Sequence, residues 1–149
     1  MMDKVTLKIQ FEANFGLILK NLEGISTEEA LIFPQNEANC VNWILGHLIC
    51  SRNLILNALG EKSVWDNERF YCYGRYVNAL AVQQEFINFE LLKQYFGQTQ
   101  PVLSNGLDNL QTDAIEVVKK ISFLSLHESY HCGQLGYARR LLCKEGVIK

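Results

Sequence analysis

The sequence predicts an all-α protein, a single four-helix bundle over residues 1–149 with a long aromatic-rich loop between its second and third helices. Three observations predict this fold. Apolar residues recur at three- and four-residue steps along four long segments, no segment of useful length alternates as a strand does, and only 2 residues are proline. A chain of 149 residues suits one domain with its own core.

The first helix is predicted over residues 5–22, and Gly24 follows it as a typical C-terminal residue. The apolar side chains of this segment share one face: Leu7, Phe11, Phe15 (or Ile18) and Leu22. Ser26 and Glu29 then have the spacing of a capping box, which indicates one short helical turn ending at Pro34.

The second helix is predicted over residues 40–59, after a cap region at Asn36 and Asn39 and before Gly60. It is apolar on nearly all sides, so we expect it to be deeply buried. The loop that follows, residues 61–76, is rich in aromatic side chains and has no clear period. Such a loop either serves as a functional lid or simply packs on the bundle.

The third helix is predicted over residues 81–107, with a kink or break where Gly97 and Pro101 interrupt the apolar period. The fourth is predicted over residues 113–143, starting with a capping box at 113–116. Basic residues near its end suit the negative end of the helix dipole.

Charge and cysteine usage exclude several classes. The 14 basic and 16 acidic residues give a net charge of −2 with no basic stripe, which argues against nucleic acid as a partner. No segment is apolar enough for a membrane span, and the N-terminus lacks the features of a secretory signal. Five cysteines without a CxxC pair argue against a disulfide framework, and we expect a cytoplasmic protein.

The three histidines predict a metal site. His127 and His131 are four residues apart on the fourth helix, so both rings lie on one helical face and can bind one ion. His47 lies on the apolar face of the second helix, where an imidazole needs a partner. Placing the two helices side by side would give three nitrogen ligands with open positions, which is the catalytic type of site.

Glu128 lies between the two paired histidines, and residues 127–131 match the HExxH pattern of zinc proteases. The sequence departs from that class because no histidine follows His131. Glu128 is the candidate catalytic residue, for proton transfer or as a partner of the ligands. The alternative is a solvated or interface carboxylate on the flank of the helix.

Other residues near the histidines have competing interpretations. Gln134 could bond a ligand water or be a buried structural residue, and Cys50 is a fourth ligand or, more in line with burial statistics, a small core residue. Gly46 and Gly133 would let helices approach closely. Trp43 is a core residue or a substrate platform.

Residues 42–47 (NWILGH) and 127–140 (HESYHCGQLGYARR), some 80 residues apart, resemble the motifs of the DinB/YfiT-like superfamily of metalloenzymes. The resemblance covers essentially the whole chain. It implies a four-helix bundle, commonly dimeric, with Ni²⁺ or Zn²⁺ on His47, His127 and His131. It also implies a small-molecule substrate, with thiol S-transferases that use low-molecular-weight thiols, and hydrolases, among the relatives.

The sequence thus predicts a metal-dependent enzyme that activates a thiol or a water nucleophile. The alternative is a non-catalytic metal- or ligand-binding bundle, and a zinc protease ranks last. The apolar surplus of the first two helices also predicts a homodimer.

Overall fold

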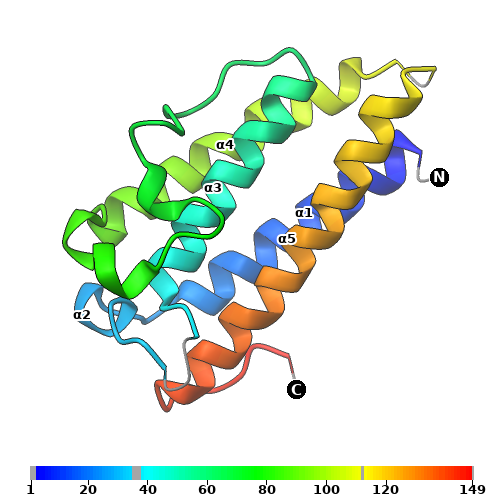
Figure 1. Ribbon diagram of the computed structural model, residues 1–149. Coiled ribbons are helices and arrows are strands. Elements are labelled where there is room, and N and C mark those ends of the chain that lie inside the picture. Colours follow the sequence, from blue (N-terminus) through cyan, green and yellow to red (C-terminus); the bar gives the residue numbers. More distant parts are fainter. Residues whose placement is uncertain (1–2, 35–37, 112, 149) are drawn as a thin grey trace.

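The computed structural model describes residues 3–34, 38–111 and 113–148, and these residues are helical with no strand (Figure 1). The helices in chain order are α1 (Lys4–Leu22), α2 (Thr27–Ala30), α3 (Val41–Ala58), α4 (Phe89–Asn109) and α5 (Ile115–Leu141). Two short 3-10 segments, η1 (Tyr71–Tyr73) and η2 (Ala79–Glu85), lie between α3 and α4. None of the described helices is long and apolar enough to cross a bilayer.

The four long helices contact one another in a closed ring: α1 packs on α4 and α5, and α3 packs on α4 and α5. Asn42 at the start of α3 donates to Ile87 just before α4, whereas Asn105 at the end of α4 donates to Glu61 just after α3. Consequently α3 and α4 run in the same direction, and residues 59–88 return along the length of α3 (Figure 1). This crossover brings η1 against α3.

Helix ends follow the sequence signals in part. The capping box at Ser26 and Glu29 is confirmed, and Gly24 and Gly60 each follow a helix with the positive φ that glycine tolerates. Asn36 lies outside the described residues, and Cys40, not Asn39, precedes α3 without a side-chain cap.

The capping box predicted at 113–116 is wrong. Ala114 is the residue at the cap, and no side chain bonds the free N–H groups there. Glu116 instead pairs with Lys119 one turn further on, so its carboxylate does not reach back to the cap.

The third helix also differs from the prediction. It begins at Phe89, because residues 79–85 form the separate segment η2, whose Gln83 side chain donates to the carbonyl of Leu31. The sequence predicted a kink or a break at Gly97 and Pro101, and the helix runs through both residues without a break. Pro101 is exposed, so the carbonyl one turn earlier that loses its partner lies on the solvent side and can bond water.

The core consists of two clusters that meet between the helices. One surrounds the first half of α3 and includes Trp43, Tyr73, Phe89 and Phe96. The other fills the opposite end, between α1, the second half of α3, α4 and the start of α5. As expected, every residue from Val41 to Ile49 is buried. His47 therefore lies on the most deeply buried part of the chain.

Candidate metal centre

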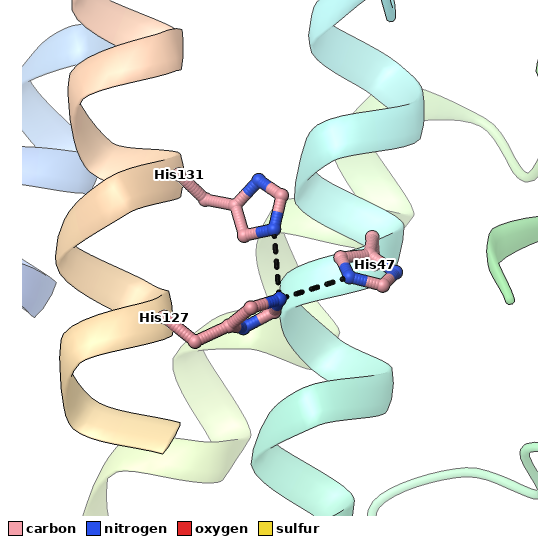
Figure 2. Close-up of side chains that lie close together, drawn as sticks. All are labelled: His47, His127 and His131. Carbon is pink, nitrogen blue, oxygen red and sulfur yellow. Dashed lines mark hydrogen bonds between the residues drawn. The ribbon is translucent and has the colours of Figure 1, made fainter. Parts of the chain in front are cut away.

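The three histidines converge, as the sequence predicts (Figure 2). His127 Nε2 lies 3.0 Å from His131 Nε2 and 3.4 Å from His47 Nε2. One ligand atom from each ring lies within 4.8 Å of the others, and among the described residues this is the group of histidines, cysteines and carboxylates that could hold an ion. α3 supplies one ring and α5 the other two.

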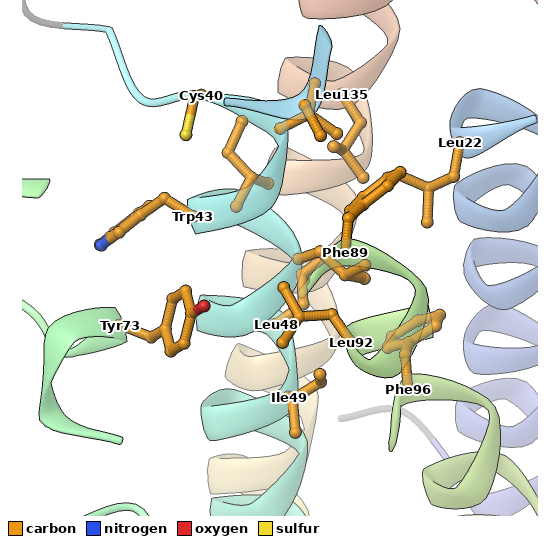
Figure 3. Packing of buried hydrophobic residues seen from close by; sticks show 14 of the residues in the cluster. Leu22, Cys40, Trp43, Leu48, Ile49, Tyr73, Phe89, Leu92, Phe96 and Leu135 are labelled. Atoms are coloured by element: carbon orange, nitrogen blue, oxygen red, sulfur yellow. The ribbon is translucent and has the colours of Figure 1, made fainter. Parts of the chain in front are cut away.

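One turn of α3 is built to receive the segment η1. Trp43 Nε1 donates to the carbonyl of Cys72, and Asn42 Oδ1 accepts from the hydroxyl of Tyr73. Gly46 leaves the space for the Tyr73 ring, because a Cβ there would overlap ring atoms. Figure 3 shows Tyr73 lying against this part of α3. Gly46 thus permits a close approach, although of an aromatic ring and not of a helix.

The docked segment orients His47. The Nδ1 atom of His47 lies 2.8 Å from the carbonyl oxygen of Tyr73. A carbonyl only accepts, so Nδ1 carries the proton and the lone pair is on Nε2, which faces the other two histidines. Trp43 stacks on the His47 ring at 4.7 Å between centroids and is itself buried. Trp43 is therefore a core residue that holds the ring.

His131 has a matching partner on its own helix. Its Nδ1 atom lies 2.6 Å from Gln134 Oε1, and Gln134 Nε2 donates to the hydroxyl of Tyr130. The sequence left Gln134 as a partner of a ligand water or as a buried structural residue, whereas the structure gives it a direct bond to the His131 ring and leaves it half-buried. Gly133, by contrast, has nothing within 4 Å of the position of a Cβ, so no close helix approach requires it.

Burial keeps the three rings neutral. It is the main cause that lowers the pKa of His47, His127 and His131, and the value for His131 falls to about 4. The charge of Arg75 further lowers the pKa of His47 and His127. Neutral imidazoles are the form that binds metal, so the rings keep their lone pairs available near neutral pH.

The donor set fits a divalent ion. Nitrogens bound at about 2.0–2.1 Å to a tetrahedral ion lie about 3.3 Å apart, close to the 3.0 and 3.4 Å found here. Lone pairs facing one another at such distances require a proton or a cation between them. Two of the rings also have the outer partner that ligand histidines commonly have, whereas the Nδ1 atom of His127 has none among the described residues.

Glu128 does not face the histidines' nitrogens as a free carboxylate. Both of its oxygens accept hydrogen bonds from Arg52, at 2.7 and 2.9 Å, and its side chain is buried. It is therefore neither solvated nor on an open flank. Its catalytic role stays a prediction, and the pairing favours a structural one.

Sequence reasoning missed two residues of this site, Arg52 and Tyr73. Arg52 is the one Asp, Glu, Lys or Arg within residues 40–59, and this was the available signal, because a buried charge needs a partner. Tyr73 contributes its carbonyl to His47, and a backbone group leaves no mark in the sequence.

A cavity of about 210 Å³ opens beside the histidines. We call it the histidine cavity, and the residues that line it include His47, Cys50, Ser51, Arg75, Phe123 and His127. Cys50 thus borders the cavity but is not part of the convergent group. Burial raises the pKa of its thiol to about 12, so this thiol stays protonated and is a poor nucleophile.

No protein-family model and no curated protein matches this chain. The described residues form a helical structure in which three histidines are placed to bind a metal ion.

Proposed function

We propose that the protein is a metal-dependent enzyme that holds a divalent ion, Ni²⁺ or Zn²⁺, on His47, His127 and His131. The observation that carries this proposal is the convergence of three Nε2 atoms whose rings are neutral and, in two cases, oriented through Nδ1. Three protein ligands leave a position open, which is the arrangement of catalytic sites.

Bound there, a divalent ion would lower the pKa of a thiol or a water molecule and so produce a nucleophile at neutral pH. The residues of the chain do the rest. The Tyr73 carbonyl and Gln134 hold the ring planes of His47 and His131, and the histidine cavity gives a small substrate room next to the rings. A deprotonated thiol that attacks an electrophilic carbon forms a C–S bond and expels the leaving group, whereas a hydroxide gives hydrolysis.

The fold and motifs support a place for this chain in the DinB/YfiT-like superfamily. The contacts of α1 and α3 with both α4 and α5 support assigning the chain a four-helix bundle with a crossover. The NWILGH motif at 42–47 has a structural account here, because Asn42, Trp43, Gly46 and His47 all serve the docking of η1. A low-molecular-weight thiol as co-substrate follows from the resemblance alone.

Metal binding is tested first, on untagged protein, because an affinity column can load nickel. We expect about one divalent ion per chain by elemental analysis, and stoichiometric Zn²⁺ and Ni²⁺ uptake by calorimetry after chelation. His127→Ala should lose this uptake, while the control Tyr137→Phe, an exposed residue on the same helix, should retain it. Equal uptake by His127→Ala and the wild type would refute the site.

Activity is tested on a panel of low-molecular-weight thiols with electrophiles, and on esters and amides for hydrolysis. We expect turnover that chelation abolishes and Ni²⁺, Zn²⁺ or Mn²⁺ restores. Full turnover in His127→Ala would end the enzymatic proposal in this form.

A second candidate is a non-catalytic metal- or ligand-binding bundle. The distance between the ligands in the sequence favours it. An ion bound by His47 and His127, which are 80 residues apart, would hold α3 against α5 and so stabilise the fold. This candidate predicts that removing metal strongly lowers the melting temperature and that no panel substrate is turned over.

We also propose that the protein is a cytoplasmic homodimer. Exposed apolar side chains follow one face of α5, namely Phe123, Leu126, Tyr130, Tyr137 and Leu141. Such a face is typical of an interface between copies. The five cysteines are free, as suits a reducing compartment.

A further inference from the structure

The histidine cavity has an uneven chemical lining. Apolar side chains, Leu54, Phe123 and Leu124, form much of its wall. Ser51 also lines it and is buried. Among the described residues, no aspartate or glutamate lines the cavity. A ligand held here would therefore meet an apolar surface with few polar contacts.

Arg75 is the cationic residue of the lining. It follows Tyr73 and Gly74 in the segment that orients His47, and it is exposed while also lining the cavity. Its guanidinium lies 5.4 Å from the ring of Tyr76, and no carboxylate in the described part of the chain is paired with it. By contrast, Arg52, the other arginine close to the site, is fully engaged by Glu128, Thr99 and Gln100.

From these contacts we infer that the histidine cavity binds a small carboxylate with an apolar body, and that Arg75 anchors the carboxylate. This deepens the proposed function, on which it rests, by naming the chemical class of its substrate. A guanidinium is the side chain that best matches a carboxylate, through two parallel hydrogen bonds. The apolar body would lie on Leu54, Phe123 and Leu124. The volume of about 210 Å³ is below the ~300–1,000 Å³ of sites for drug-sized ligands.

The inference is tested by binding of two matched probes, para-fluorobenzoate and para-fluorobenzamide, followed by fluorine NMR on metal-free and on zinc-loaded protein. In the metal-free protein we expect the carboxylate to bind about tenfold more tightly than the amide, because of the charge-assisted bonds to Arg75. Arg75→Gln should remove this preference and Arg75→Lys should keep part of it. Arg69→Gln, an exposed arginine in the same connection that does not line the cavity, should keep all of it.

Leu54→Trp tests whether the probes bind in the cavity. Leu54 lines the cavity, so the larger side chain should occupy part of its volume and lower the affinity for both probes. Equal affinity for the two probes, an unchanged preference in Arg75→Gln, or unchanged binding in Leu54→Trp would each overturn the inference. The metal-free arm keeps the two proposals separate. Loss of zinc uptake with an intact Arg75 effect would refute only the proposed function, and zinc uptake without an Arg75 effect would refute only the carboxylate site.

Discussion

The guanidinium of Arg52 and the carboxylate of Glu128 form an ion pair in the interior, with side-chain exposures of 0% and 1%. Arg52 also donates to Thr99 and Gln100 on α4, so one side chain joins α3, α4 and α5. Glu128 lies directly after His127 and one turn before His131. The pair therefore fixes the rotation of α5 that turns both histidines toward α3.

Breaking this pair should be costly. Arg52→Met leaves the Glu128 carboxylate buried without its partner, which costs about 3–5 kcal/mol in comparable sites. We expect urea denaturation to show a loss of that order. In the double variant Arg52→Met/Glu128→Leu no charge remains buried, so much of the loss should be recovered. If Arg52→Met were as stable as the wild type, the structural role of the Arg52–Glu128 pair would be contradicted.

Glu128→Gln separates a structural from a catalytic role. Since the amide keeps the size but loses the charge, we expect lower stability with the zinc affinity and any turnover largely retained at low temperature. A folded Glu128→Gln variant that binds zinc normally but has no turnover would instead establish Glu128 as the proton-transfer residue.

Gly46→Ala should disturb the metal centre through Tyr73. The added methyl group would overlap the Tyr73 ring, and such overpacking costs about 1–3 kcal/mol. Displacement of η1 would also remove the carbonyl that orients His47, so zinc affinity should fall together with stability. Gly133→Ala is the matched control, because its Cβ meets nothing within 4 Å. It should gain about 0.5–1 kcal/mol from helix propensity, and an equal effect of the two variants would argue against this account.

Gln134→Leu should weaken metal binding without removing a ligand. It deletes the acceptor for His131 Nδ1, and loss of such outer partners lowers metal affinity by about 10–100-fold. Competition titration with a chelator measures the change. Tyr130→Phe removes only the hydroxyl to which Gln134 donates, and it should have a small effect. An unchanged affinity in Gln134→Leu would mean that His131 is oriented by packing alone.

The metal-free protein should lose stability as the pH falls. Burial lowers the pKa of His131 from 6.5 to about 4 and also lowers that of His47. Between pH 6.5 and about pH 4, His131 is largely protonated in the unfolded chain but not in the folded one. The free energy of unfolding therefore decreases as the pH drops through this range. Urea denaturation of the wild type and of His131→Asn at pH 7.5 and 5 should show the steeper decrease in the wild type. Parallel decreases would contradict the buried neutral ring.

The proposed dimer can be tested by placing a charge on the apolar face of α5. Leu126 is 64% exposed, so Leu126→Lys should leave the stability of the isolated chain nearly unchanged. Light scattering after gel filtration should show a dimer for the wild type and a monomer for the variant. A monomeric wild type would exclude the homodimer.

The sequence was sufficient to predict the four long helices and the three histidines for definite reasons. Apolar periodicity reports which face of a helix is buried, and the spacing of His127 and His131 reports a shared face whatever the tertiary structure. The same periodicity extended the third helix back to residue 81. Local preference could not reveal that residues 79–85 leave the helix to contact α2, where Gln83 bonds the Leu31 carbonyl.

The partners of the site could not be predicted because they depend on distant chain segments. Arg52 and Glu128 are 76 residues apart, and Asn42 and Tyr73 are 31 apart. Their pairing follows from the crossover that makes α3 and α4 parallel, which short connections would not have produced. Glu128 illustrates the consequence: its position in the sequence suggested a flank, whereas an arginine from α3 meets it in the interior.

The Tyr73 carbonyl, Gln134 and the Arg52–Glu128 pair all act on the histidines from within the polypeptide. The rings are thus set in place before any ion arrives, so loading need not be coupled to folding. The newly synthesised chain can fold first and bind its ion afterwards. Which element it carries in a cell then depends on what that cell supplies, because imidazoles accept several transition metals.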